Sequence, residues 1–205
     1  MINFNKLYLA YKISKNPERA GDFALLKSTA FGARANRRTE AKMQSVRGYY
    51  PEIDLEKLSQ LLPGTFGYEY ARYMQENKLR PIKISSKFAE IAQNNVFATR
   101  YAVTHDIFHV LLGFDTSYAG EIGVLAFAVE QNYSRMLNFS LFPAMVIYSA
   151  IAPNQLKSIL ANVRRGKQMA RKASFLLSYR FEDYWTKPID TVRSDLGIEC
   201  RATKL

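Results

Sequence analysis

Two histidines, His105 and His109, are the residues whose type and spacing best suit chemistry. They are the only histidines in the chain and stand four positions apart, so a helix would place both rings on one face, one turn apart. Asp106 adjoins the first, and Glu121 follows the second beyond a turn marked by Gly113. Imidazoles with nearby carboxylates suit divalent metals, and the pattern does not distinguish zinc, iron, magnesium and manganese. The spacing therefore predicts a metal site.

The role of Asp106 stays open on spacing alone. The motif resembles the HExxH helix of zinc proteases, in which the acid is a base and not a ligand. Aspartate is one methylene shorter, so it reaches a metal-bound water less easily, but neighbours about 100° apart on a helix can both border a site. Glu121 is expected as a ligand from the next, antiparallel helix; simple stabilisation of that helix's N-terminus is the alternative. The lone cysteine, Cys200, is expected to be a bystander.

Helical spacing recurs along the chain and strand-like alternation is scarce, which predicts an all-α fold. With 205 residues and 48% hydrophobic residues, we expect one domain over 1–205, a helical bundle with a central metal-bearing helix and an apolar lipid-sized cavity. Helices are predicted at 3–13, 18–31, 55–62, 64–74 and 96–112, from 121 onward, and at 155–177. The apolar segment 139–152 either packs in the core, the commoner outcome, or lines the cavity.

The net charge of +11 indicates an anionic partner: nucleic acid, an anionic lipid surface or a phosphorylated ligand. Nucleic acid is not expected, because the aromatic residues are not grouped with arginine and lysine. The basic stretch 34–48 is either a solvated surface or an anion-facing arm. The apolar run 136–152 is short and broken, and residues 1–16 lack a cleavage site. We therefore expect a soluble or peripheral protein, in the cytoplasm or on the cytoplasmic face of a membrane.

The four candidate ligands also match a family hallmark. With His105, Asp106, His109 and Glu121 in place, the sequence resembles the fourth-numbered Coq family of ubiquinone (coenzyme Q) biosynthesis, whose motif is His-Asp, two residues, His, eleven residues, Glu. Further matches are Leu62–Gly67, Arg100-Tyr101, Gly166-Lys167, Glu182, Trp185, Pro188, Arg193 and Leu196–Ile198. The resemblance covers about residues 50–200, and residues 34–47 have no counterpart in it.

The resemblance implies an all-α fold, a metal held by those four residues and an apolar channel for a polyprenyl tail. It implies a metal-dependent oxidative decarboxylase that removes the ring carboxyl of a polyprenyl hydroxybenzoate and hydroxylates the same carbon. The alternative is a non-catalytic scaffold that holds an isoprenoid lipid for quinone-biosynthesis enzymes, with a structural metal. Candidate lining residues are Leu125, Phe127, Phe142 and Met145. Expected partners are an isoprenoid or prenylquinone-type lipid, a peripheral membrane surface, other quinone-biosynthesis proteins and a second copy of the chain.

Overall fold

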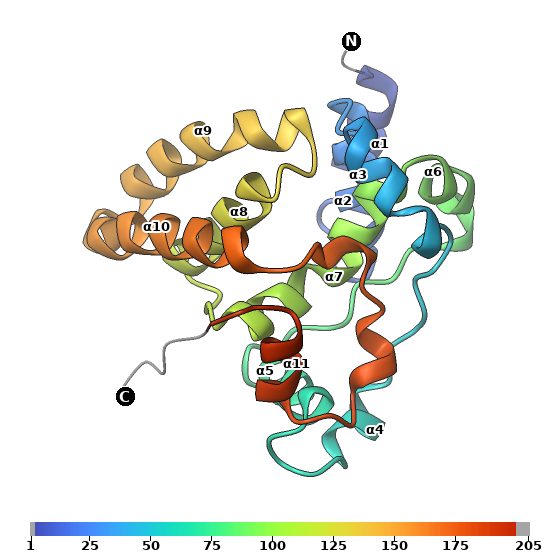
Figure 1. Cartoon of the computed structure of the whole chain (residues 1–205). Helices are drawn as coiled ribbons and strands as arrows, with labels where there is room; N and C mark the ends of the chain where they lie inside the picture. Colours follow the sequence, from blue (N-terminus) through green and yellow to red (C-terminus); the bar gives the residue numbers. More distant parts are fainter. Residues whose placement is uncertain (1–2, 200–205) are drawn as a thin grey trace.

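The structure is a computed structural model that describes residues 3–199, and across these residues it consists of helices and connecting turns, with no β-strand. The predicted all-α class is therefore confirmed. The α-helices are α1 (Phe4–Ile13), α2 (Ala20–Ala30), α3 (Arg37–Lys42), α4 (Leu55–Ser59), α5 (Phe66–Glu76), α6 (Ala89–Asn94), α7 (Val96–Leu112), α8 (Tyr118–Glu130), α9 (Arg135–Ile151), α10 (Leu156–Lys172) and α11 (Ile189–Asp195). Figure 1 shows α7 in the middle, between α8–α10 on one side and the N-terminal helices on the other.

The main core is built around α7. Phe108 of this helix meets Phe127 of α8 with ring centroids 6.1 Å apart, and Phe181 of the C-terminal segment at 6.2 Å. All three rings are wholly buried, as is Phe66 of α5. Burying such rings stabilises the fold by about 1.5–3 kcal/mol each. The helix that carries both histidines is therefore held on several sides by packed side chains.

Helices α8 and α10 approach each other through two glycines. A Cβ atom built on Gly166 would lie 2.3 Å from the carbonyl oxygen of Gly123 and 3.1 Å from the amide nitrogen of Phe127. No side chain fits there without separating the two helices, because carbon and oxygen cannot approach so closely. This close packing fixes the helix that carries Glu121 against the long basic helix.

The C-terminal segment returns to the core, as predicted. Trp185 lies against Phe66 with ring centroids 4.6 Å apart, and Phe181 and Leu196 are buried. The backbone of Phe66 donates a hydrogen bond to the carbonyl of Lys187, at the point where the Thr65 hydroxyl caps α5. The family-like turn before α5 thus anchors the tail as well as starting a helix.

Arg100 connects α7 to this segment from inside the core. Its side chain is 1% exposed, and its guanidinium donates to the carbonyls of Tyr49 (3.1 Å) and Tyr179 (2.9 Å) and, at a longer 3.4 Å, to that of Leu177. The Glu182 carboxylate lies 3.8 Å away. A buried cation needs such partners because its desolvation is costly. Arg100 therefore links three parts of the chain through one charged group.

The apolar segment 139–152 is covered on one side only, where Leu141 and Ala152 are buried, so the expectation that it packs in the core was only partly right. It forms most of α9, where Phe139 is 77% and Phe142 is 75% exposed. Val146, Ile147 and Ile151 are also exposed. Periodicity indicates which residues share a face of a helix, but it does not indicate whether another element covers that face. α9 packs on α8 through its other side and leaves an apolar face uncovered.

Several helix ends differ from the predictions: the helix predicted at 55–62 ends at Ser59, and the one predicted at 18–31 spans Ala20–Ala30. The basic helix α10 ends at Lys172 and not at 177, because Ala173 adopts an extended backbone conformation. Cys200 lies outside the described residues.

Within the described part of the chain, no single helix is long and apolar enough to be a candidate membrane span. Helix α9 and the segment Pro153–Lys172 reach that length and composition only as a pair bent by 116°.

Candidate metal centre

Helix α7 delivers the two histidines. Its first turn is capped by the side chain of Asn95, and it ends at Gly113, which adopts the left-handed conformation with φ of 65°. Glycine takes this conformation without strain, and the chain reverses direction there. The reversal brings the carbonyl of Phe114 back to the ring of His109. The helix predicted from about Val96 to Leu112 is confirmed.

Glu121 arrives from the first turn of α8. The helix begins at Tyr118 and not at Glu121, because Ser117 caps it by accepting a hydrogen bond from the amide of Gly120. Asp115 in turn accepts hydrogen bonds from the amide and the hydroxyl of Ser117. A Cβ atom at position 120 would lie 1.9 Å from the Asp115 carbonyl oxygen, so only glycine permits this turn. The loop is thereby fixed, and Glu121 faces α7.

The two histidines and Glu121 come together as a compact group. One ligand atom from each lies within 4.8 Å of the others. His105 Nε2 is 3.5 Å from one oxygen of Glu121, and His109 Nε2 is 3.3 Å from the other. Burial raises the pKa of Glu121, but the imidazoles of His109 and His105 outweigh it, so the pKa of this carboxyl is lowered. A carboxylate kept ionised between two imidazoles suits a divalent cation.

The environment of His109 tests this fit. Its Nδ1 lies 3.2 Å from the Phe114 carbonyl, and because a carbonyl only accepts, Nδ1 must carry the hydrogen. In the neutral ring Nε2 then bears a lone pair, directed toward an oxygen of Glu121. Nε2 is buried and has no hydrogen-bond partner among the described residues. The lone pairs of His109 Nε2 and of the Glu121 oxygen repel each other unless a proton or a metal cation lies between the two atoms. The arrangement of His109 and Glu121 therefore fits a bound metal cation.

Asp106 lies at the other nitrogen of His105. Its carboxylate is 3.5 Å from His105 Nδ1, whereas Nε2 of the same ring faces Glu121. Burial lowers the pKa of His105, but Asp106 and then Glu121 outweigh it, so the pKa is raised overall. A carboxylate in this position orients a ligating imidazole and increases its basicity. The predicted ligation by Asp106 stays a prediction, since the compact group comprises the other three side chains.

Two tyrosines border the group, and the metal motif alone did not indicate them. The ring of Tyr73, from α5, stacks on His109 at 6.0 Å, and the ring of Tyr101 meets His105 edge-on at 6.0 Å. The Tyr73 hydroxyl is buried without a hydrogen-bond partner in the described residues. Burial, followed by the charges of Asp106 and Glu121, raises the pKa of Tyr73 well above its usual value. Its phenol therefore stays protonated as an available donor. The sequence signals for Tyr101 were its position one turn before His105 and the Arg100-Tyr101 match to the family.

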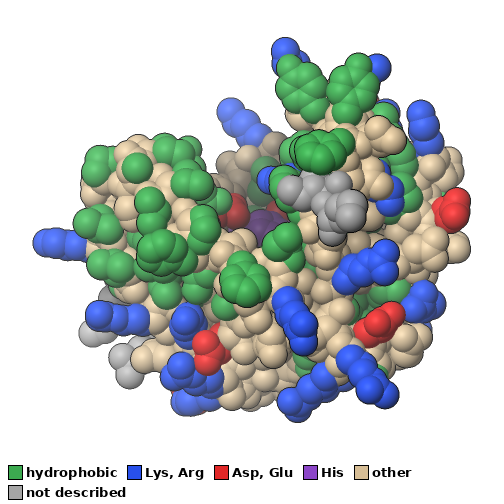
Figure 2. Space-filling view, turned by 90° about the horizontal axis from the view of Figure 1, so that it is seen from above, with side chains coloured by type: hydrophobic (Ala, Val, Ile, Leu, Met, Phe, Trp, Pro, Cys, Tyr) green, Lys and Arg blue, Asp and Glu red, His purple; other side chains and the backbone are tan. Residues whose placement is uncertain are grey.

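An apolar cavity lies beside these residues. Its volume is about 380 Å³, and it is lined from α2, α7 and α9 by residues that include Phe31, Phe97, Tyr101, Met136 and Phe139. Tyr101 belongs both to this lining and to the surroundings of His105. Figure 2 shows the surface hollowed between the apolar α9 side and the N-terminal helices, with histidine visible at the base. The metal group is thus one aromatic ring away from an open, apolar space.

The four lining residues predicted from the sequence do not meet in this cavity. Phe127 lies in the main core, and Phe142 is on the exposed face of α9. Leu125 and Met145 pack in a small cluster between α8, α9 and α10. The cavity is formed instead by α7, by the end of α2 and by the start of α9, and the sequence did not indicate that α2 and α9 line one cavity. The use of these four residues by a lipid stays a prediction.

Comparison with known proteins agrees with the resemblance noted in the sequence. Residues 47–201 match the family described as Coenzyme Q (ubiquinone) biosynthesis protein Coq4. The chain is 31% identical over 150 residues to the Ubiquinone biosynthesis protein COQ4 homolog, mitochondrial, of Danio rerio (72% of this chain, 54% of that protein). It is 30% identical over 147 residues to the protein of the same name from Homo sapiens (71% and 55%). The chain thus spans about half the length of these relatives.

A solved structure supports the fold. A crystal structure from Nostoc punctiforme, described as that of a ubiquinone biosynthesis protein, matches with a TM-score of 0.67 and covers 98% of this chain and 100% of its own. Its sequence is 23% identical, so the likeness concerns the fold. The family match covers the turn before α5, both histidines, Glu121 and the C-terminal tail. From the sequence match over these residues, the chain belongs to the Coq4 family of coenzyme Q (ubiquinone) biosynthesis proteins.

Proposed function

We propose that this chain binds a polyprenylated aromatic acid beside a divalent metal and acts in its oxidative decarboxylation and hydroxylation. The observation that carries the proposal is the compact group of His105, His109 and Glu121, one ring away from an apolar cavity. A bound redox-active metal would supply sites for ring oxygens and for dioxygen. Three protein ligands leave such sites open. The family membership supports quinone biosynthesis as the pathway.

The chain's own residues would bind the tail, exclude water and orient the groups at the site. The apolar cavity would take part of the isoprenoid tail and keep water away from the ring. The Tyr73 hydroxyl, buried and unpaired in the described structure, would donate a hydrogen bond to an oxygen held at the site. Asp106 would hold the ring of His105 through Nδ1. In the net reaction the ring carboxyl leaves as carbon dioxide, and one atom of dioxygen becomes the ring hydroxyl. An external donor supplies two electrons and two protons to reduce the other oxygen atom to water.

Purified full-length protein tests this proposal directly. We expect one equivalent of divalent metal by elemental analysis and a co-purified prenyl lipid by mass spectrometry. With a polyprenyl hydroxybenzoate, dioxygen and a chemical reductant, we expect carbon dioxide release together with the hydroxylated ring. Metal and lipid without turnover would favour the scaffold alternative, in which partner enzymes do the chemistry. A protein that retains neither metal nor lipid would contradict both.

Access for such a lipid would come from a membrane surface. Helices α9 and α1 lie at the same end of the molecule (Figure 1), and hydrophobic side chains flank the hollow between the α9 side and the N-terminal helices (Figure 2). The exposed residues of α1 include Phe4, Tyr8 and Tyr11. An exposed patch of this kind marks a lipid or protein contact, and aromatic residues interspersed with lysine are typical of membrane interfaces. We propose that this side rests on the membrane, so that a lipid tail enters between α9 and the N-terminal helices.

The double variant Phe139→Ser/Phe142→Ser is expected to lower binding to lipid vesicles at least about tenfold, because two largely exposed rings no longer enter the bilayer. Vesicle co-sedimentation measures the change. Leu62→Ser is the matched control, since Leu62 is 78% exposed on the distant turn before α5. Unchanged vesicle binding together with a smaller molecular mass in solution would assign the α9 face to contact between two copies of the chain instead.

A further inference from the structure

A second candidate site lies at the start of α9, outside the metal centre. It is a hollow of about 320 Å³ lined by the loop before α3 and by the first residues of α9. Its lining includes Arg34 of the loop, Arg37 at the start of α3 and Arg135 at the start of α9. None of the three forms an ion pair within residues 3–199. By contrast, nearby Arg171 pairs with Glu130 at 2.8 Å. Three arginines without acidic partners create a positive potential there.

The N-terminus of α9 adds donors to the same hollow. In a helix of 17 residues the first amides lack partners within the helix, and here the residue at the cap position, Ser134, makes no capping hydrogen bond. Ser134 is wholly buried, lines the hollow, and its hydroxyl has no hydrogen-bond partner among the described residues. A buried, unpaired hydroxyl is costly. The helix start therefore adds an unpaired hydroxyl and the positive end of its dipole to the lining of the hollow.

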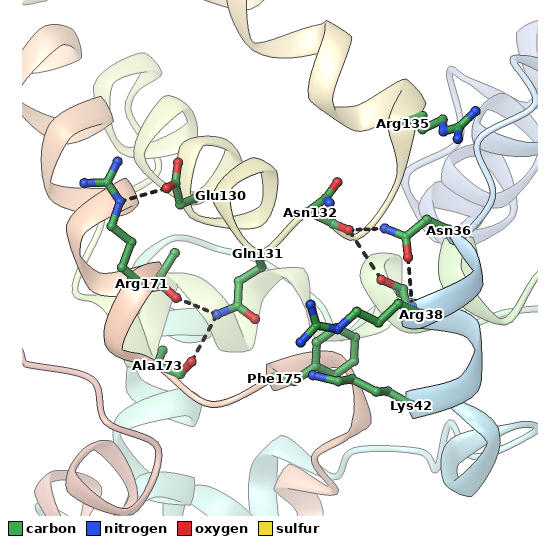
Figure 3. Close-up of a pocket in the computed structure, with 12 residues that line it drawn as sticks. Asn36, Arg38, Lys42, Glu130, Gln131, Asn132, Arg135, Arg171, Ala173 and Phe175 are labelled. Atoms are coloured by element: carbon green, nitrogen blue, oxygen red, sulfur yellow. Dashed lines mark hydrogen bonds and ion pairs between the residues drawn. The ribbon is translucent and has the colours of Figure 1, made fainter.

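The arginine loop is held rigidly in place. Figure 3 shows Asn36 hydrogen bonded to the backbone of Asn132 in the turn between α8 and α9. The backbone amide of Asn36 also donates to the carbonyl of Tyr133 at 3.2 Å. The side-chain oxygen of Asn36 caps α3 by accepting a hydrogen bond from the backbone amide of Thr39. Asn132 itself adopts a left-handed backbone conformation, with φ of 54°. The backbone of the loop and the helix start are thus fixed to each other, which places Arg34, Arg37 and Arg135 around one hollow.

An adjoining cavity extends the basic surface. It has a volume of about 530 Å³ and shares Asn36 and Arg135 with the hollow. Figure 3 shows Arg38 and Lys42 directed into it beside Phe175, and the Lys42 ammonium lies 4.7 Å from the centre of that ring. A ligand whose anionic group occupies the hollow therefore has room for its remaining atoms in a second positively charged space.

We propose that the hollow binds the phosphate group of a phosphate ester, carried either by a soluble molecule or by a phospholipid headgroup. Forked guanidinium groups and a helix N-terminus suit the tetrahedral, multiply charged phosphate. The site is separate from the metal centre, and its arginine loop precedes residues 47–201, which match the family. It gives the basic stretch 34–48 the role of an anion-facing arm.

The test compares two charge-matched double variants of the full chain. Arg37→Gln/Arg135→Gln removes two arginines of the hollow, and Lys157→Gln/Arg164→Gln removes two exposed charges of α10. Titration calorimetry with inorganic phosphate at constant ionic strength is expected to show a dissociation constant at least about 30-fold higher in the first variant and changed less than about twofold in the second. Ser134→Ala is expected to weaken binding by about 3- to 10-fold.

A second measurement distinguishes the sources of the phosphate. Vesicles of phosphatidylcholine with and without phosphatidylglycerol replace inorganic phosphate in co-sedimentation. Saturable phosphate binding with the stated variant pattern supports a soluble ester. Sedimentation that depends on phosphatidylglycerol, with the same variant pattern and without binding of free phosphate, supports a lipid headgroup. Equal losses in the two double variants, no binding of either probe, or loss of binding in Glu121→Gln would overturn the proposal, the last because the anion would then sit on the metal.

Discussion

Replacing Glu121 with glutamine is expected to weaken divalent metal binding at least about 100-fold while the fold remains intact. The amide keeps the shape of the side chain but removes the negative charge that lies 3.3 and 3.5 Å from the two ring nitrogens. A cation would then meet two neutral imidazoles and a weaker oxygen donor. Elemental analysis of purified protein and competition with a chromophoric chelator measure the loss, and circular dichroism checks the fold.

Glu130→Gln is the matched control for this variant. It changes the same residue type in the same helix, but the Glu130 carboxylate pairs with Arg171 at 2.8 Å and takes no part in the compact group. Its metal content should equal that of the wild type. Full metal retention in Glu121→Gln would contradict the proposed metal centre.

Because the pKa of His105 is raised, protons compete with the metal for its ring, so the metal affinity of the wild type should fall as the pH falls through that pKa.

Asp106→Asn separates the two roles that the sequence left open. A carboxylate that only orients His105 is expected to cost about 10- to 100-fold in metal affinity when its charge is removed. A loss as large as that in Glu121→Gln would identify Asp106 as a direct ligand. The distinction rests on position, because the Asp106 carboxylate lies at Nδ1 of His105 and the Glu121 carboxylate at Nε2.

The metal centre was more predictable from the sequence than its surroundings. His105 and His109 required only the helical repeat, and Glu121 required only a turn that reverses the chain. These are local features, which residue type and spacing specify. The hydrogen bond from His109 to the Phe114 carbonyl depends on the left-handed Gly113, so the glycine was visible but its consequence for the ring was not.

Features that depend on distant contacts could not be predicted. The apolar cavity needs residues of α2 and α9 to line one space, and no spacing within either helix indicates that. The exposed face of α9 has the same sequence pattern as a buried helix, because burial is decided by whether another element covers it. The hollow at the start of α9 joins Arg34 and Arg135, which are about 100 positions apart in the chain. In the sequence, Arg34 was only part of a basic run that could be either a solvated surface or an anion-facing arm.

Arg100→Met is expected to lower the free energy of unfolding by about 3–5 kcal/mol, the largest stability effect anticipated for this chain. The change leaves the carbonyls of Tyr49 and Tyr179 without their donor and leaves the mostly buried Glu182 carboxylate without its cation. Denaturant titration measures the loss. Arg164→Met, on the exposed face of α10, is the control and should change stability by less than about 0.5 kcal/mol.

The pH dependence of this loss tests its cause. Burial raises the pKa of Glu182, and Arg100 partly lowers it again, so Arg100→Met is expected to raise that pKa further. The folded variant then holds a proton that the unfolded chain releases, and its unfolding free energy falls as the pH rises through this window. The deficit of Arg100→Met relative to the wild type should therefore be smaller at about pH 5 than at about pH 7.5. The double variant Arg100→Met/Glu182→Met removes both charges of the pair. At the higher pH its unfolding free energy should exceed that of Arg100→Met by at least about 1 kcal/mol, and its deficit relative to the wild type should not change with pH in this way. A deficit that stays constant with pH would assign the whole effect to the unpaired carbonyls.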